Sequence, residues 1–397
     1  MPFAPTEVRP KPHQELLLKA VLLRGEEAVR AWKAWRAANP PDATDRPSRR
    51  LLPVAYGNLR EAALSDAELA PLREAYEKSR AENQQKLSAA RPVVEALVAA
   101  GIDVLVLKGA ALTRFYGGDL GLRPMRDIDV LVPPDQTKRA TATLSDLGYE
   151  PAGVGVSCLE RYAYRQSPGW LFVRPNAPDV DLHWHTLHES RQPNADDDFR
   201  QGAISLDFQG VAVKALNATD QLLHVCIHGL QREPQENLRW IVDAMGILRH
   251  EAEPIDWLRL LAQVTRRRLV LQAYHCLEYL TATFAAPIPA QALEQLRGAP
   301  VSWLERSEFR ARLHSERIGT LGQAVLAHQQ EVRRGSDASV RAFRRSLPRH
   351  LWGASRWWQM PAWTVLDWLG VELRPGTAWA RAVFGPPAEP ASPAAPA

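Results

Sequence analysis

The chain has 397 residues, of which 46% are apolar and 24% charged, as in ordinary globular proteins with two or three domains. It contains no run of 18 apolar residues, and its first residues lack the pattern of a secretory signal, so the sequence argues against a transmembrane or secreted protein. The net charge of +4 permits a phosphate-bearing ligand but does not call for nucleic acid. Three scattered cysteines argue against a disulfide framework or a cysteine-based zinc site, and they favour a reducing, cytoplasmic location.

The N-terminal part of the chain, to residue 100, predicts a helical segment. Apolar residues recur with helical spacing over residues 13–37, which predicts one helix with an apolar face, and residues 51–59 predict a second, short element. A capping-box pattern that begins at Ser65 predicts a helix to about residue 87. A further helix is expected over residues 92–100, because a proline stands at its start and a glycine follows its end.

The next element is a short apolar run, residues 104–107, which has the length and β-branched content of a buried strand. It ends at Lys108 and Gly109. Gly109 lacks a Cβ, so the backbone there can turn and approach a ligand closely. Residues 110–116 predict a helix that starts at this turn, where an anion such as phosphate is favoured and Lys108 would add a positive charge.

An acidic pair follows at Asp127 and Asp129, at the start of an alternating run, residues 128–132, that predicts a strand. Side chains two residues apart on a strand share a face, so the two carboxylates point the same way. Two crowded carboxylates repel each other unless a cation lies between them, and the pair therefore predicts a hard divalent metal such as magnesium. The alternative is a solvent-facing acidic pair on an edge strand.

The rest of this region predicts a mixed sheet with helices against it. A helix is expected from Asp135 to about residue 147. The expected strands are residues 160–166, 170–174, 180–184, 204–208 and 211–216. The last two are separated by Gln209 and Gly210, a pattern typical of a hairpin.

From residue 217 to residue 384 the pattern is almost wholly helical. Asn217 or Thr219 is expected to cap the first helix. The expected helices are residues 221–230, 237–250, 257–284, 290–296, 302–314, 321–334 and 340–358. Residues 385–397 are mostly proline and alanine and predict a disordered tail.

A second informative motif lies in the expected strand of residues 180–184. Asp181, His183 and His185 share one face of this strand, and Leu182 and Trp184 the other. The two histidines are candidates for metal binding, for nucleotide contact or for hydrogen bonding to their neighbours. A polar strand end beside a buried tryptophan is the simpler alternative.

Together these motifs resemble the DNA polymerase beta-like nucleotidyltransferase superfamily, and most closely a bacterial group of uncharacterised nucleotidyltransferases. The resemblance covers roughly residues 15–260. It is carried by residues 107–109 (Leu-Lys-Gly), residues 115–118 (Phe-Tyr-Gly-Gly), Arg123 and residues 127–132. The turn departs from the superfamily pattern, because Ala110 stands where a serine is usual, and the interval to the first aspartate is longer.

The resemblance implies a fold, a domain plan and a set of site residues. The fold class is α+β, a polymerase-beta-like nucleotidyltransferase domain at residues 101–216 between helical segments at 1–100 and 217–384. A later strand supplies a third carboxylate, for which Asp181 is the candidate and Asp179 the reserve. The catalytic and metal-binding residues implied are Asp127, Asp129 and Asp181. The nucleotide-binding residues implied are Lys108, Gly109, Arg123, Arg126 and His183.

The activity implied is a two-metal transfer of a nucleoside monophosphate from a nucleoside triphosphate to an acceptor, most simply a small molecule. Magnesium or manganese would be the cofactor, and Asp181 could take the acceptor proton. Two alternatives stay open. One is a protein that binds nucleotides or partners without turnover. The other is an enzyme that modifies an RNA end or a protein side chain, using the arginines and tryptophans of residues 341–358 for docking.

Two further patterns lie in the helical region. His224 and His228 are four residues apart on one predicted helix face, but Val225 stands where zinc proteases have glutamate, so packing beside the sheet is favoured over metal binding. Arg239 and Asp243 have the spacing of an i,i+4 ion pair on the next helix.

Overall fold

The computed structural model describes residues 9–40, 44–160, 164, 167–192, 194–230, 237–302, 305–306 and 308–309. The chain divides into two compact units, residues 1–313 and 314–397, and all described residues belong to the first. The strand predicted at residues 160–166 and the helix predicted at 302–314 lie for the most part outside the described residues. The helices predicted at 321–334 and 340–358 and the tail predicted at 385–397 lie wholly outside them.

The N-terminal segment is helical, as predicted, but its first helix is divided. It contains α1 (Pro12–Leu22), α2 (Gly25–Ala38), α3 (Arg46–Arg49) and α4 (Leu52–Leu59). The prediction of one helix over residues 13–37 is therefore wrong: the backbone is extended at Leu23, and Gly25 adopts a positive φ of 59°. This break reverses the chain, so that Leu17 on α1 and Trp35 on α2 both become fully buried.

Helix α5 (Asp66–Ala99) begins at the predicted capping box, in which Ser65 and Glu68 exchange hydrogen bonds. It then continues without a break through Pro92, where a new helix was predicted. A proline inside a helix removes one backbone hydrogen bond. Here Val93, Val94 and Leu97 are buried in the core just after the proline, and this burial offsets the missing bond.

The described part of the chain forms one seven-stranded mixed sheet, which confirms the α+β class. The strands are β1 (Leu105–Val106), β2 (Ile128–Leu131), β3 (Glu150–Pro151), β4 (Gly169–Val173), β5 (Val180–His183), β6 (Ile204–Phe208) and β7 (Val211–Ala215). Their order is β3-β4-β5-β2-β1-β7-β6. Strand β2 is central; it runs antiparallel to β1 and parallel to β5. The predicted hairpin joins β6 and β7, with positive φ values at Gln209 and Gly210.

Short helices connect the strands on either side of β2. They are α6 (Lys108–Leu112), the 3-10 turn η3 (Thr113–Tyr116), the 3-10 turn η4 (Pro134–Gln136), α7 (Thr137–Asp146), α8 (Val156–Cys158) and α10 (Asp197–Gln201). The turn η4 and α7 correspond to the helix predicted from Asp135. The sequence patterns did not predict α8 or α10.

The later helices are α11 (Ala218–Gly229), α12 (Arg239–Leu248), α13 (Trp257–Arg267), α14 (Val270–Phe284) and α15 (Ala290–Gly298). Asn217 caps α11 through its side chain, as predicted. The single helix predicted over residues 257–284 is divided at Arg268, which adopts a left-handed conformation with φ 55°. No helix in the described residues has both the length and the apolar character needed to cross a membrane.

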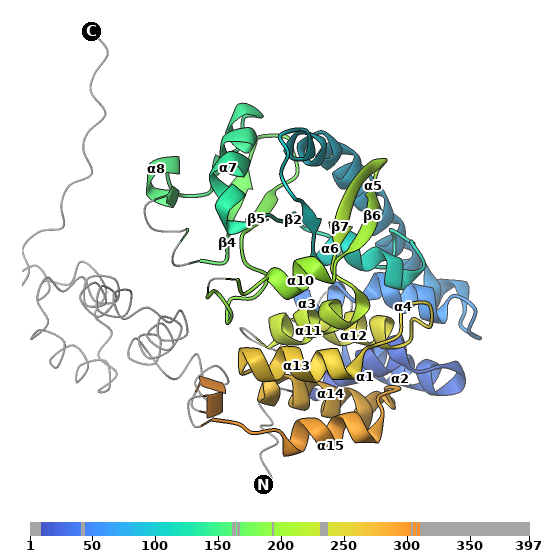
Figure 1. The fold of residues 1–397 in the computed structure, drawn as a ribbon. Helices are drawn as coiled ribbons and strands as arrows, with labels where there is room; N and C mark the ends of the chain where they lie inside the picture. The colour runs from blue at the N-terminus through green and yellow to red at the C-terminus, as the bar shows by residue number, and fades with distance from the viewer. Residues whose placement is uncertain are drawn as a thin grey trace, which may run out of the picture. The chain divides into compact units, whose positions relative to one another are not determined.

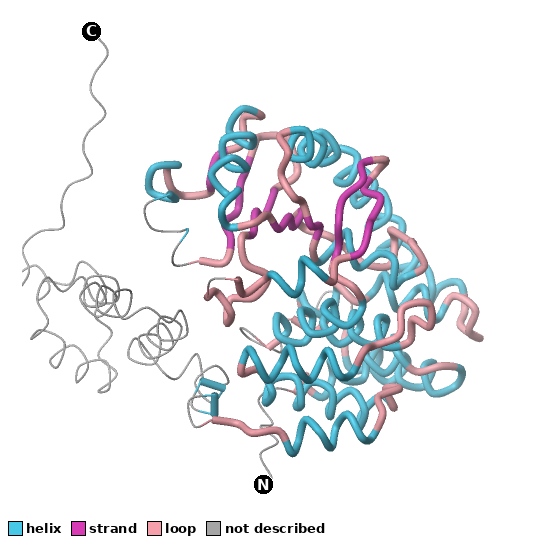
Figure 2. Tube along the Cα trace, in the orientation of Figure 1, coloured by secondary structure: helices cyan, strands magenta, loops and turns pink. Residues whose placement is uncertain are grey.

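The sheet lies between two hydrophobic cores because its central strand alternates. Ile128 and Val130 face a core formed with α5 and α7, whereas Leu131 joins a core with α1, α2 and the later helices. Figure 1 shows α1 and α2 beside α12, α14 and α15, although these helices are far apart in sequence. Figure 2 shows the strands gathered at one end of this helical assembly. Asp129 lies between Ile128 and Val130 in the strand, so it points toward the face where α11 packs.

Candidate functional site

Strands β2 and β5 place two acidic side chains opposite each other. Asp129 and Asp181 are direct partners in the parallel register, and His183 follows two residues after Asp181 on the same face. One ligand atom from each of these three residues lies within 4.8 Å of the other two. Asp129 is only 3% exposed. The structure therefore brings together the second and third of the carboxylates named from the sequence.

Lys108 supplies a cation to this acidic pair. Its Nζ donates a hydrogen bond to Asp129 Oδ1 at 2.6 Å and lies 3.5 Å from Asp181 Oδ2. Burial alone would lower the pKa of Lys108, but the two carboxylates raise it above its ordinary value, so the group stays an ammonium. Lys108 has a positive φ of 43°, which is uncommon for a residue with a side chain. The sequence predicted that Gly109 would make the turn. In the structure, the residue with the left-handed backbone conformation is Lys108.

His183 adds a second positive charge. Its Nε2 lies 2.9 Å from Asp181 Oδ2 and 3.3 Å from Asp129 Oδ1. Burial disfavours the imidazolium, but Asp181 outweighs this effect and raises the pKa of His183 to about 9. In turn, although burial raises the pKa of Asp181, His183 and Lys108 hold it well below its usual range. Two anions and two cations therefore balance within this cluster.

Asp127 and Gly109 lie next to this cluster. Asp127 immediately precedes β2 and is half-buried, and burial together with the nearby Asp129 raises the pKa of its carboxyl group. Gly109 is buried, and a Cβ added to it would lie 2.8 Å from Met125 Cγ. The close packing of Met125 therefore leaves no room for a side chain at this position unless Met125 moves.

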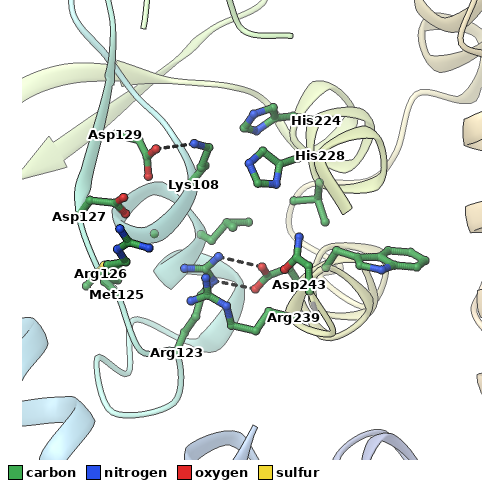
Figure 3. Close-up of a pocket in the computed structure, with 15 residues that line it drawn as sticks. Lys108, Arg123, Met125, Arg126, Asp127, Asp129, His224, His228, Arg239 and Asp243 are labelled. Atoms are coloured by element: carbon green, nitrogen blue, oxygen red, sulfur yellow. Dashed lines mark hydrogen bonds and ion pairs between the residues drawn. The ribbon is translucent and has the colours of Figure 1, made fainter. Parts of the chain in front are cut away.

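Helix α11 faces Asp129 and Lys108 across the pocket with two histidines (Figure 3). His224 is 2% exposed, and its Nδ1 has no hydrogen-bond partner. Burial, together with the positive charges of Lys108 and His183, lowers the pKa of His224 to about 3. Burial and Lys108 also keep the pKa of His228 well below its usual value. Both imidazoles are therefore neutral at ordinary pH.

The other end of the pocket contains a buried ion pair between Arg123 and Asp243. Arg123 donates from Nε to Asp243 Oδ1 at 2.7 Å and from Nη2 to Oδ2 at 2.8 Å. The Tyr116 hydroxyl donates to the same carboxylate at 2.6 Å. The sequence resemblance implied that Arg123 binds the nucleotide. In the structure, its guanidinium instead binds a carboxylate of the protein itself.

Arg239 does not form the i,i+4 ion pair with Asp243 that its spacing predicted. Instead, Nη1 of Arg239 donates to the Pro124 carbonyl at 2.6 Å, and Nε is buried without a hydrogen-bond partner. Arg123 takes Asp243 because it approaches with both nitrogens in one plane, a geometry that suits arginine and carboxylate. The sequence signal for Arg239 was present in its spacing from Asp243, but it indicated the wrong partner.

These side chains line one pocket, which holds about 520 Å³ of space, part of it open solvent. Six residues named in the sequence analysis line the pocket: Lys108, Gly109, Arg123, Arg126, Asp127 and Asp129. Of these, Arg126 is exposed. Asp181 and His183 are not among the lining residues, but they adjoin the pocket through Lys108, whose Nζ lies 3.5 Å from Asp181 Oδ2. The lining residues that the sequence did not assign to a ligand are Leu112, Met125, His224, Val225, His228, Asn237, Arg239, Trp240 and Asp243.

Two other candidates from the second motif lie apart from this pocket. His185 pairs through Nδ1 with Asp196 Oδ2 at 2.8 Å, and this contact holds β5 to the segment before α10. The Asp179 carbonyl accepts a hydrogen bond from the Ile128 amide at 3.0 Å, at the start of the β2–β5 pairing. Neither residue belongs to the group of Asp129, Asp181 and His183.

Comparison with known protein families assigns this region. A family model described as uncharacterised nucleotidyltransferase matches residues 48–285, more than half of the chain, and this range includes every pocket residue. A solved structure of an antigenic nucleotidyltransferase-like protein from Paracoccidioides brasiliensis is 18% identical, covers 53% of this chain and 97% of its own, and has a TM-score of 0.32. A comparison with curated proteins found no match.

Proposed function

Because the chain belongs to this family of uncharacterised nucleotidyltransferases, we propose that it transfers a nucleoside monophosphate from a nucleoside triphosphate to the hydroxyl of a small acceptor molecule. The observation that carries the proposal is the pairing of Asp129 with Asp181 across β2 and β5, next to a pocket that Asp127 and Lys108 line.

The residues present fit a hard divalent cation. Carboxylate oxygens are the ligands that magnesium and manganese prefer, and Asp129 and Asp181 provide them within one small group. We assign Asp127, Asp129 and Asp181 to hold the metal, with His183 behind them. Bound there, magnesium or manganese would neutralise charge on the phosphates and activate the acceptor oxygen.

The protein's own groups would bind and orient the substrates. Lys108 occupies the space between Asp129 and Asp181 that the metal would take, so with the metal bound its ammonium would turn to the phosphates on the pocket side. Asp181, kept ionised by His183 and Lys108, would accept a hydrogen bond from the acceptor hydroxyl and position its oxygen. His224 and His228 would offer neutral hydrogen-bonding groups to an uncharged part of a substrate.

A labelling experiment tests this proposal. The protein is incubated with each α-labelled nucleoside triphosphate, with magnesium or manganese, and with candidate acceptors. Asp129→Asn should reduce transfer by about a hundred- to a thousandfold, because it removes a buried charge from the reacting site. Asp146→Asn, on the exposed end of α7, makes the same chemical change away from the pocket and should leave transfer unchanged.

Two outcomes of this experiment would contradict the proposal. Transfer that Asp129→Asn does not reduce would contradict the assignment of the acidic site. Nucleotide binding in calcium without turnover in magnesium for every acceptor would favour a protein that binds nucleotides without reacting them. Thermal unfolding of each variant is measured alongside, so that a loss of folded protein is separated from a loss of catalysis.

A further inference from the structure

Arg239 carries a positive charge that the described residues leave without a carboxylate partner. It lines the pocket from the first turn of α12 and is only partly accessible to solvent. Its Nη1 is bonded to the Pro124 carbonyl, its Nε is buried without a partner, and no described carboxylate lies within ion-pair distance. A largely buried charge without a counter-ion is costly, and an anionic ligand would offset this cost.

The neighbouring charges increase this cost. Asp243 is the nearby carboxylate, and it already accepts two hydrogen bonds from Arg123 and one from Tyr116. Burial, with the positive charge of Arg123 adding to it, lowers the pKa of Arg239 to about 10. Arg239 nevertheless remains a cation at neutral pH. Arg123, which is bonded to Asp243, repels it.

The charges that line the pocket add up to an excess of cations. Lys108 and Arg123 are neutralised by Asp129 and Asp243, respectively. Among the described lining residues, this leaves Arg126 and Arg239 with Asp127 as their one remaining counter-charge. Figure 3 shows Arg123 and Arg239 side by side at one end of the pocket, with Lys108, Asp127 and Asp129 at the other. An anionic occupant would relieve this imbalance.

We propose that Arg239 binds the polyphosphate of the nucleoside triphosphate, at the phosphates that leave together as pyrophosphate. This proposal rests on the proposed function and specifies the subsite within it. The planar guanidinium offers a fork of N–H donors that matches phosphate oxygens, and its Nε donor has no partner among the protein's described residues. Arg123 has a supporting role in this proposal, because it occupies the Asp243 carboxylate that could otherwise pair with Arg239.

Binding of pyrophosphate alone, measured by calorimetry in magnesium without nucleotide or acceptor, tests this subsite. The wild-type protein should bind pyrophosphate and gain thermal stability. Arg239→Gln should weaken this binding about tenfold or more, the usual effect of losing a charge-assisted hydrogen bond. Arg249→Gln is the matched control, because Arg249 follows α12, bonds to the Leu22 carbonyl and is absent from the pocket lining.

A structural role for Arg239 would give a different result. If it only tied α12 to the Pro124 carbonyl, Arg239→Gln would lower the melting temperature and leave pyrophosphate affinity unchanged, and this would overturn the proposal. We expect the melting temperature without ligand to stay within about 2 °C of wild type or to rise, because the change removes an unpaired charge. Should Arg239→Gln not fold, Arg239→Lys decides: it should bind pyrophosphate several-fold more weakly, and wild-type affinity would overturn the proposal.

A phosphate on the acceptor is the other source of the same chemistry. Ribose 5-phosphate, a phosphomonoester, is therefore titrated in parallel. If Arg239→Gln weakened its binding and left pyrophosphate binding intact, the subsite would belong to the acceptor and the polyphosphate assignment would be overturned. No binding of pyrophosphate to the wild type would also overturn it. Arg239-dependent binding in a protein that transfers no nucleotide would leave the subsite standing and contradict only the proposed function.

Discussion

The two walls of the pocket treat charge in opposite ways. On the strand wall, the carboxylates of Asp129 and Asp181 lie between Lys108 and His183, with charged atoms 2.6 to 3.5 Å apart. On the helix wall, His224 and Arg239 are desolvated and each has a buried nitrogen without a hydrogen-bond partner. The charges of the strand wall are compensated within the protein, although Nδ1 of His183 is also buried without a hydrogen-bond partner. On the helix wall, by contrast, Arg239 has no carboxylate partner among the described residues, and a ligand could supply one.

The contrast is clearest between two arginines of the same pocket. Arg123 has a carboxylate partner, and although burial opposes the charge, Asp243 raises its pKa above the ordinary value. Arg239 has none among the described residues, and burial lowers its pKa. The same residue type is thus a structural element in one position and a candidate ligand-binding group in the other. Local charge compensation, rather than residue type, distinguishes the two roles.

The largest expected effect is on the stability of the Arg123–Asp243 pair. Asp243→Asn should lower the free energy of unfolding by about 3–5 kcal/mol, because it leaves the buried Arg123 guanidinium without its counter-ion. Arg239→Gln, in the same pocket, should lower it by well under about 1 kcal/mol, since no ion pair is broken. Urea unfolding of both variants measures the difference.

A double variant provides the control for this comparison. Arg123→Gln with Asp243→Asn restores two neutral groups that can bond to each other, and it should recover most of the stability lost in Asp243→Asn. Equal losses in Asp243→Asn and Arg239→Gln would show that the two arginines are equivalent, and the distinction between a paired and an unpaired cation would fail.

The strand wall could be predicted from the sequence, because strand periodicity alone puts alternate residues on one face. Alternation placed Asp129 opposite the apolar Ile128 and Val130, and the structure adds the register that brings Asp181 beside it. The hairpin followed from Gln209 and Gly210 and β1 from its apolar run, whereas β3 was not predicted. The functional roles of these residues stay a prediction, as do the domain limits at residues 100 and 216.

The helix wall could not be predicted in this way, because long-range partners decide it. Spacing indicated that Asp243 could reach Arg239, but not that Arg123, far away in the sequence, would reach it with better geometry. Local rules failed for the same reason at Pro92, where burial in the core outweighs the missing hydrogen bond. They also failed at Arg268, where the chain leaves the helix at a residue that is not glycine.

A smaller effect is expected from His224, and it depends on pH. The pKa of His224 is about 3 in the folded protein, because of burial and the charges of Lys108 and His183, against about 6.5 in the unfolded chain. Between these values the unfolded state binds one more proton. The contribution of His224 is therefore complete above pH 6.5, and stability falls by about 1.4 kcal/mol for each pH unit below it.

His224→Leu removes this titration. At pH 7.5 the variant should be as stable as the wild type or slightly more so, since the unpartnered Nδ1 is gone. At pH 5.5 it should exceed the wild type by about 1 kcal/mol, because only the wild type loses stability through His224. The free energy of unfolding of both proteins is measured by urea unfolding as a function of pH. If it changed with pH in the same way in both, His224 would not titrate as proposed, and this prediction would be wrong.

The smallest effect concerns Gly109, where the two walls meet. Gly109→Ala should cost about 1 kcal/mol of stability, because the new methyl group would overlap Met125 and force this buried side chain to move. Gly298→Ala is the matched control, since a Cβ there meets no other atom within 4 Å.

The sequence offered a different reason for Gly109, the close approach of a ligand, and one experiment separates the two reasons. Packing alone predicts a loss of stability that Met125→Ala in the same chain reduces, because the two changes share one contact. Ligand approach alone predicts normal stability with weaker nucleotide binding that Met125→Ala does not restore.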